Sequence, residues 1–129
     1  MDFISSRNVP PPAGHYSQAV RHAGLVFVSG MLPITAIGEK IRGSMAEQTR
    51  QVLQNIEAVL RAAESSVEQV IKVTVYVSDI KYWDEVNSVY AEFFGAHRPA
   101  RAVVPTRDLH FGLGVEMDVV AACNENPQP

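Results

Sequence analysis

The stretch VIKVTVYVS, residues 70–78, decides the fold class of this 129-residue chain. Apolar and more polar residues alternate along it, and a period of two is typical of a β-strand with one face on a core. The stretch therefore predicts a strand that covers a hydrophobic core. We expect its core face to consist of Ile71, Val73, Val75 and Val77.

Helical patterns flank this strand on both sides. We predict a helix from about Ser44 to Ala63, because Ser44 and Glu47 form a capping box and apolar residues then recur at helical spacing. A second helix is predicted from about Tyr82 to Phe94, with Gly95 placed to end it. Each helix has one apolar stripe, which we interpret as a core-facing surface.

Four shorter stretches complete the predicted sheet, over residues 16–21, 25–29, 101–105 and 115–123. The order β-β-α-β-α-β-β contains no repeat and predicts one α+β domain over residues 1–129, with both helices on one face of the sheet. We expect flexible ends over residues 1–9 and 124–129. The uncovered face would carry a mixture of side chains that other copies of the chain would cover, including Thr74, Tyr76, Glu116 and Val120.

The composition narrows the functional classes. A net charge of −3 with scattered Lys and Arg residues lacks the basic footprint of a nucleic-acid-binding protein. No apolar run approaches the ~18 residues of a membrane span and no signal segment opens the chain, so we expect a cytoplasmic protein with no membrane partner. The single cysteine, Cys123, fits a reducing compartment. The four histidines show no metal-binding spacing, and phosphate-binding glycine motifs are missing, so we expect no metal and no cofactor.

Seven short stretches, spread in order over residues 10–122, carry a family resemblance. They are PAGHYSQAV at 12–20, VSGMLP at 28–33, VTVYVSD at 73–79, VNSVY at 86–90, FF at 93–94, PAR at 99–101 and VEMD at 115–118. Together they resemble the reactive intermediate deaminase family, known as RidA/YjgF or endoribonuclease L-PSP-like proteins. The resemblance implies a chorismate-mutase-like (ferredoxin-like) mixed sheet, a homotrimer with active sites between subunits, and no cofactor. It also implies hydrolysis of 2-aminoacrylate-type enamines and 2-imino acids to 2-keto acids and ammonia.

Arg101 is the first candidate site residue. A planar guanidinium can grip a carboxylate with two parallel charge-assisted hydrogen bonds, which fixes both charge and orientation. An arginine that follows a proline loop is more often an ordinary surface residue. The matching Pro-Ala-Arg context reverses that preference, and the resemblance implies that Arg101 binds the substrate carboxylate.

Glu116 is the second candidate. Hydrolysis of an imine needs a water molecule held against the carbon, and a carboxylate can orient that water and accept its proton. Glu116 and Asp118 lie two apart on one strand face, where repulsion or burial could raise the pKa of one of them. A solvated strand edge or an interface ion pair is the alternative. The resemblance implies that Glu116 belongs to the site and that Asp118 is structural.

Four further residues are candidates for substrate binding. Tyr16 and Ser29 supply hydroxyl groups, Asn87 supplies an amide, and Val103 offers backbone groups where many relatives carry cysteine. Each also has a purely structural interpretation, as a half-buried tyrosine, a turn serine, a helix–loop contact and a strand residue. These alternatives stay open at the level of the sequence.

Several positions depart from the family pattern. His15 stands where a proline is usual, Met31 replaces glutamine, and His110 lies in a segment, residues 108–114, that replaces a plainer turn. We interpret these changes as a sign of a different substrate, such as a larger or more apolar imine. Glu64 stands where relatives often end the first helix with glycine, so we expect that helix to run on.

Two other functions remain open. The same clefts could hold a small carboxylate as a signal, without catalysis. Ribonuclease or translation-inhibiting activity is the other, and the acidic composition argues against it.

Overall fold

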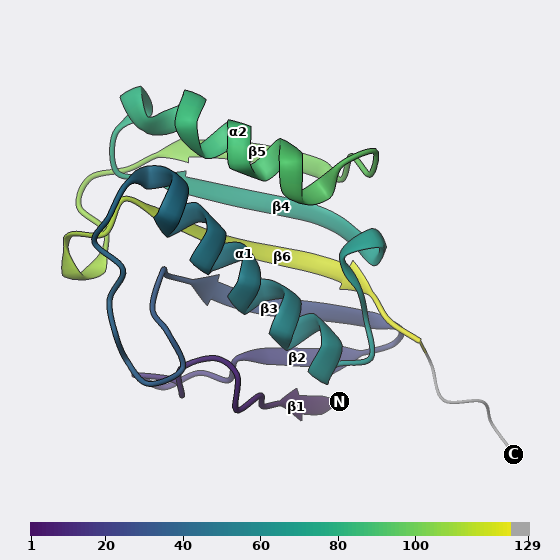
Figure 1. Cartoon of the computed structure of the whole chain (residues 1–129). Coiled ribbons are helices and arrows are strands. Elements are labelled where there is room, and N and C mark those ends of the chain that lie inside the picture. Colours follow the sequence, from purple (N-terminus) through teal and green to yellow (C-terminus); the bar gives the residue numbers. More distant parts are fainter. Residues whose placement is uncertain (125–129) are drawn as a thin grey trace, which may run out of the picture.

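The computed structural model describes residues 1–124 and confirms the α+β fold (Figure 1). Its helices are α1 (Met45–Ala62) and α2 (Trp83–Phe94), with 3₁₀ turns η1 (Val67–Gln69), η2 (Ile80–Tyr82) and η3 (His110–Gly112). Its strands are β1 (Asp2–Ile4), β2 (Ala19–His22), β3 (Leu25–Met31), β4 (Val70–Val77), β5 (Ala100–Pro105) and β6 (Val115–Ala122). Of the tail expected to be flexible, residues 125–129 lie outside the described residues.

One six-stranded sheet has the strand order β1-β2-β3-β6-β4-β5. β4 and β5, which α2 connects, run parallel, and all other neighbours are antiparallel. α1 and α2 lie side by side across one face of the sheet (Figure 1). This arrangement is the mixed sheet with two helices on one face that the family resemblance implied.

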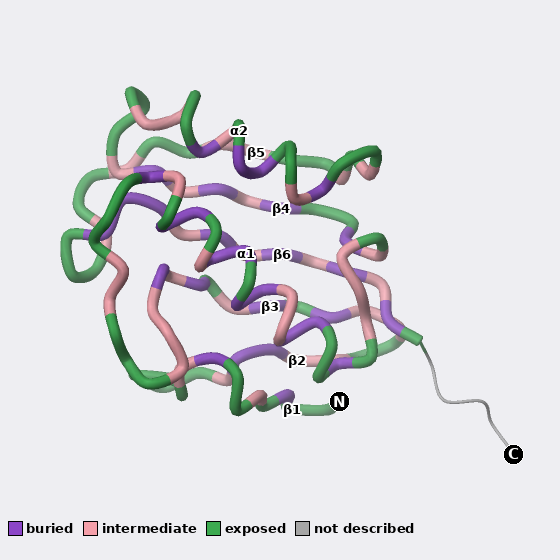
Figure 2. The backbone as a smooth tube through the Cα atoms, viewed as in Figure 1, coloured by how far each residue is buried: buried purple, intermediate pink, exposed green. Residues whose placement is uncertain are grey.

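The core lies between the helices and this face of the sheet. Val52, Ile56 and Leu60 of α1 are fully buried in one cluster with Val75 of β4 and Met117 of β6. Figure 2 shows buried residues recurring along α1, β4 and β6, where they alternate with less buried ones in the strands. Burial of each such side chain contributes about 1.5–3 kcal/mol, so this layer is the main source of stability.

Both ends of α1 have identifiable caps. The Ser44 hydroxyl oxygen accepts a hydrogen bond from the Glu47 N–H at 3.1 Å, which confirms Ser44 as the N-cap. The other half of the predicted capping box differs, because the Glu47 carboxylate accepts from the Ser44 hydroxyl at 3.5 Å. The prediction that the helix runs on past Glu64 was wrong. Glu64 has a φ of 61°, and the Ser65 N–H donates to the Leu60 carbonyl at 2.8 Å. This hydrogen bond and the left-handed residue form a Schellman turn, which stops the helix without glycine.

The expected flexibility of residues 1–9 was also wrong. Asp2–Ile4 pairs with β2 as an extra antiparallel strand, so the chain begins with three strands before the first helix. The buried Gln18 side chain holds the following segment, because its amide bonds to the Ser6 N–H, the Ser6 carbonyl and the Pro10 carbonyl. Val9 is buried as a result.

The largest differences from the predicted strands lie at the start of β2 and inside β4. β2 begins at Ala19, because Tyr16 lies in a bend. In β4 the register with β6 shifts between Val70 and Lys72, so Val70 is buried and Ile71 is 46% exposed. Ile71 was predicted to lie on the core face, and this was wrong because the extra residue of the bulge turns its side chain away from the core.

Candidate active site

Arg101 lies in a cradle formed by one side of α2. Trp83, Asn87 and Tyr90 are spaced by four and three residues, which places them on the same side of the helix. The Arg101 Nη1 donates to the Asn87 Oδ1 at 2.9 Å. The guanidinium carbon lies 4.7 Å from the centre of the Trp83 ring and 4.9 Å from that of Tyr90. Two cation–π contacts and one hydrogen bond therefore orient the planar cation, while its exposed side remains available to a ligand.

The sheet register explains how the side chain reaches α2. Arg101 pairs with Val73 and Val103 pairs with Val75, and these two β4 valines are buried on the helix-covered face. β5 is the edge strand of the sheet. Val103 packs against the core, whereas Arg101 extends to the solvent side of α2.

Glu116 lies on the opposite, uncovered face, at the start of β6. Its carboxylate is packed over Gly30, where a Cβ atom would lie 2.5 Å from Oε2, so this contact requires glycine. Ser29, the preceding residue of β3, donates its hydroxyl to the Ser17 carbonyl at 2.6 Å. The structure thus brings Glu116 next to the Ser29–Gly30 segment.

Half-burial distinguishes Glu116 from an ordinary surface carboxylate. Burial raises the pKa of Glu116, opposed by the charge of His110 and reinforced by that of Asp118. Asp118 itself accepts a hydrogen bond from the Tyr76 hydroxyl at 2.9 Å, and this bond raises the pKa of Tyr76. Glu116 is therefore the carboxylate better suited to exchange a proton, while Asp118 is engaged by its neighbour.

Arg101 and Glu116 do not meet within one copy of the chain. Glu116 pairs with Tyr76 and Tyr76 with Val104, so Arg101 lies three residues along β5 from the level of Glu116. Two strand spacings and three residues correspond to about 14 Å in the plane of the sheet, and the two side chains leave on opposite faces. One small acid cannot touch both groups of a single copy.

Comparison with known proteins identifies the family. Residues 6–123 match the family model described as Endoribonuclease L-PSP. The chain belongs to this RidA/YjgF family. Protein HMF1 of Saccharomyces cerevisiae is 41% identical over 119 residues, which are 92% of each chain. The crystal structure of the YjgF gene product from E. coli covers 95% of this chain and 98% of its own, with a TM-score of 0.90 and 32% identity. That of E. coli TdcF with bound serine covers 96% of this chain and 100% of its own, with a TM-score of 0.91 and 30% identity.

Two buried amides of α1 position the backbone around the Glu116 side of this RidA/YjgF-family chain. Asn55 donates to the carbonyls of Leu32 and Ile34, directly after β3. Gln48 accepts a hydrogen bond from the Gly114 N–H at 2.8 Å, directly before β6. Both strands that carry the Ser29 and Glu116 segments are therefore held from the core side.

Tyr16 lies in the loop before β2. It is 51% exposed, and its hydroxyl accepts a hydrogen bond from the Ala13 N–H of its own loop at 3.3 Å. His15, beside it, is exposed.

The other two departures from the family pattern differ in exposure. Met31 is buried in the core, so its side chain is a packing element. His110 is exposed in η3, close enough for its charge to lower the pKa of Glu116. Of the departures from the family pattern, His110 is thus the one whose charge reaches a site residue.

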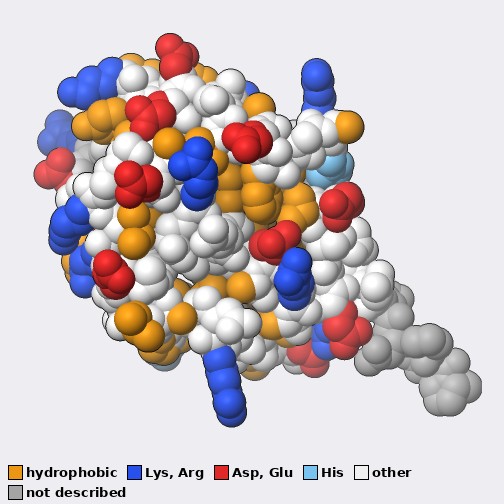
Figure 3. Space-filling view, in the orientation of Figure 1, with side chains coloured by type: hydrophobic (Ala, Val, Ile, Leu, Met, Phe, Trp, Pro, Cys, Tyr) orange, Lys and Arg blue, Asp and Glu red, His pale blue; other side chains and the backbone are white. Residues whose placement is uncertain are grey.

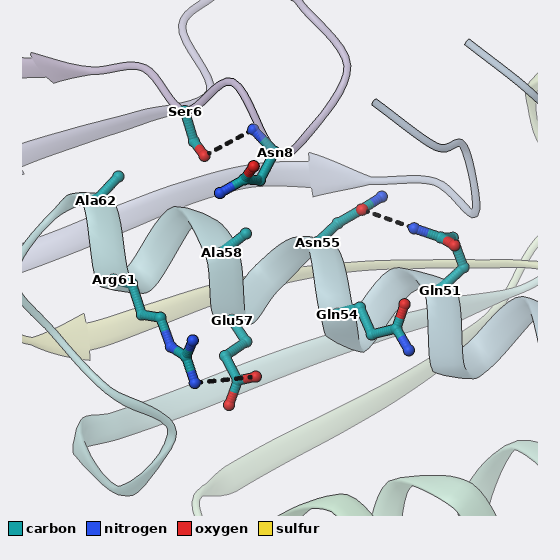
Figure 4. A pocket seen from close by; sticks show the side chains of 9 residues that line it. All are labelled: Ser6, Asn8, Gln51, Gln54, Asn55, Glu57, Ala58, Arg61 and Ala62. Carbon is teal, nitrogen blue, oxygen red and sulfur yellow. Dashed lines mark hydrogen bonds and ion pairs between the residues drawn. The ribbon is translucent and has the colours of Figure 1, made fainter. Parts of the chain in front are cut away.

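Two grooves of about 470 Å³ mark the surface. One lies between the segment of Ser6 and Asn8 and helix α1 (Figure 4). Its polar groups bond to one another, as in the pair of Gln51 with Asn55 at 2.9 Å. The other groove contains Arg101, Asn87 and Tyr90. Because only the second contains predicted site residues, it is the candidate binding pocket.

Sequence reasoning missed Trp83 and Tyr90 as parts of the site. Both belong to the apolar stripe of α2, and an apolar stripe predicts core packing. The available signal was the spacing of Asn87, which lies four residues after Trp83 and three before Tyr90 on the same side of the helix. An aromatic–amide–aromatic pattern near an arginine is consistent with a guanidinium cradle.

The described residues were compared with what a charged patch, a membrane span and a metal site would each require. Figure 3 shows positive and negative side chains interspersed over the helix-covered face. No helix within residues 1–124 is long and apolar enough to cross a membrane. In the same described part of the chain, no three His, Cys, Asp or Glu side chains gather as a metal site would require.

Proposed function

We propose that this protein hydrolyses 2-aminoacrylate-type enamines and 2-imino acids to 2-keto acids and ammonia. The observation that carries the proposal is the Arg101 guanidinium, oriented by Asn87, Trp83 and Tyr90 with its exposed side available to a carboxylate. Such a receptor suits the carboxylate that all these substrates share. The E. coli TdcF structure, a relative with bound serine, supports an amino-acid-sized ligand.

The chemistry requires one water molecule and one base. The enamine first tautomerises to the imine, taking a proton from solvent on its β-carbon and releasing one from its nitrogen. Water then adds to the imine carbon, with Glu116 accepting the proton of that water, and the resulting carbinolamine loses ammonia to leave the ketone. The raised pKa of Glu116 makes it a stronger base than an ordinary carboxylate, and it can return the proton to the departing nitrogen. Ser29 and Tyr16 are the hydroxyl groups proposed to hold the substrate or water.

The separation of Arg101 from Glu116 supports sites that are completed between copies. We assign Arg101, Asn87 and Val103 to one copy and Ser29, Glu116 and Tyr16 to its neighbour in a homotrimer. The uncovered sheet face, with Phe27 47% exposed and the Tyr76–Asp118 pair, is the surface that such an assembly would cover. The proposal includes a cytoplasmic location and no cofactor.

A trapping experiment tests the activity. The protein is mixed with a pyridoxal-phosphate-dependent serine or threonine dehydratase and its substrate, and semicarbazide captures the imine that escapes hydrolysis. Wild-type protein should lower the trapped imine, and Arg101→Ala should not. Equal trapping with wild type and with buffer would refute the proposed activity.

One specific observation favours a second candidate, a carboxylate-binding protein without catalysis: the contacts that orient Arg101 come from Asn87, Trp83 and Tyr90, and Glu116 is not among them within one copy. Glu116→Gln separates the two. If the protein is an enzyme, this variant binds pyruvate normally but loses turnover. If it only binds, no turnover is found in either form.

A further inference from the structure

Tyr90 has an unusual hydroxyl group. Its side chain is 6% exposed, and among residues 1–124 its hydroxyl oxygen is the buried side-chain polar atom without a hydrogen-bond partner. A buried hydroxyl that loses its water and gains no partner is destabilising, so native proteins rarely keep one without a use for it. The position of this group therefore calls for an explanation.

The pocket around Tyr90 contains donors and lacks an acidic acceptor. None of its nine lining residues is acidic. The guanidinium groups of Arg98 and Arg101 only donate, and the Asn87 Oδ1 already accepts from Arg101. His97 bonds through Nε2 to the Val70 carbonyl at 2.7 Å and makes no hydrogen bond to the Tyr90 hydroxyl.

The Tyr90 hydroxyl is itself a donor at neutral pH. Burial raises the pKa of Tyr90, opposed by the charge of Arg101 and by the contact of its N–H donors with the phenol oxygen, so the hydroxyl keeps its proton. A guanidinium can only donate, so this contact leaves the hydroxyl proton without an acceptor. It lies on the same side of α2 as Asn87, and its ring packs 4.9 Å from the guanidinium carbon of Arg101. An anionic oxygen placed against Arg101 is the acceptor that this cluster lacks.

We propose that Tyr90 is a substrate-binding residue whose hydroxyl donates a hydrogen bond to the carboxylate held by Arg101. This inference rests on the proposed function and adds a second donor to its carboxylate site. The carboxylate would then be bound by a charged fork and a neutral hydroxyl, with Asn87 and Trp83 keeping the fork in place. The ligand class is a small 2-imino or 2-keto acid.

Tyr90→Phe tests this assignment, since it keeps the ring beneath Arg101 and removes only the hydroxyl. The dissociation constants of pyruvate and serine are measured by calorimetry for the wild type and the variant. We expect binding to weaken by about 10- to 100-fold, the range for a hydrogen bond to a charged group. The free energy of unfolding of the unliganded variant should be unchanged or higher, because the hydroxyl proton has no acceptor among the described residues.

Tyr82→Phe is the matched control. Tyr82 is a half-buried tyrosine of the neighbouring turn η2 and does not line the pocket, so its variant should bind both ligands as the wild type does. Arg101→Ala separates this inference from the proposed function. If Arg101→Ala loses binding and Tyr90→Phe does not, the role of Tyr90 is refuted alone. If Arg101→Ala also binds normally, the carboxylate site itself is refuted. A Tyr90→Phe variant that is less stable, yet binds normally, would show a hydroxyl used for packing or assembly and would equally refute its role.

Discussion

Gly30→Ala should impair the chemistry of Glu116 without touching the carboxylate receptor. The new Cβ atom would lie 2.5 Å from Glu116 Oε2 and 3.2 Å from its carboxyl carbon. An ordinary contact begins near 3.4 Å, so the carboxylate must retreat by about 0.9 Å. Gly30 does not have a left-handed φ, so alanine adds no backbone strain. A misplacement of this size costs a catalytic group about 100-fold in rate.

The assay is the semicarbazide-coupled rate, together with the dissociation constant of pyruvate. We expect kcat to fall about 100-fold while pyruvate binding stays within about twofold, since the Arg101 that holds the carboxylate in each proposed site comes from the neighbouring copy and its cradle is unchanged. Glu116→Gln and the double variant complete a cycle. If Gly30→Ala acts through Glu116, the double variant should be no slower than Glu116→Gln alone. Wild-type kcat in Gly30→Ala, or losses that multiply in the double variant, would refute this reasoning.

Four further predictions concern pH and stability. Because burial raises the pKa of Glu116 above its ordinary 4.5, the rate should rise with pH through that raised pKa as the base ionises; a pH profile of kcat/KM whose acid limb lies at or below pH 4.5 would contradict this. The raised pKa of Glu116 also favours the protonated folded form, so the contribution of Glu116 to stability is present below pH 4.5 and is lost as the pH rises through the raised pKa. In urea titrations, the free energy of unfolding of Glu116→Gln should therefore exceed that of the wild type by more at pH 7 than at pH 4. Glu64→Gly should raise the free energy of unfolding by about 0.5–1 kcal/mol, because glycine adopts the φ of 61° at the end of α1 without strain. The ion pair that this variant loses, between Glu64 and Arg21 at 3.7 Å, is exposed on the Glu64 side and contributes little. A less stable variant would contradict this prediction. Glu85→Ala should lower the free energy of unfolding by about 1 kcal/mol, because the Glu85 carboxylate accepts a hydrogen bond from the Ala46 N–H in the first turn of α1. An unchanged urea midpoint would show that this cap is dispensable.

Local patterns were sufficient for most of the fold. Ser44 and Glu47 located the start of α1 because capping chemistry depends on residues three apart. Alternation in residues 70–78 located β4. The features of the fold that the sequence did not predict depend on contacts between residues far apart in the chain. β1 has only three residues, and it is held by pairing with β2 and by an ion pair of Asp2 with Arg21 at 3.1 Å. The exposure of Ile71 follows from a bulge against β6, which a single strand does not encode.

The site was predictable residue by residue but not as an arrangement. Arg101 and Asn87 were separate candidates, and the structure joins them in one hydrogen bond. Ser29 and Glu116 also came from short motifs, and their proximity depends on the pairing of β3 with β6. The place of Trp83 and Tyr90 was hidden because aromatic residues on a helix stripe serve equally as core and as a guanidinium cradle.

A mixture of two inactive variants tests whether neighbouring copies share one site. Arg101→Ala and Glu116→Gln are each purified, then unfolded and refolded together in equal amounts. In random trimers, roughly a quarter of the sites pair an intact Arg101 with an intact Glu116 from another copy, so imine hydrolysis should recover to about that fraction of the wild-type rate. If the refolded mixture stays as inactive as its two components, Arg101 and Glu116 do not act together across copies.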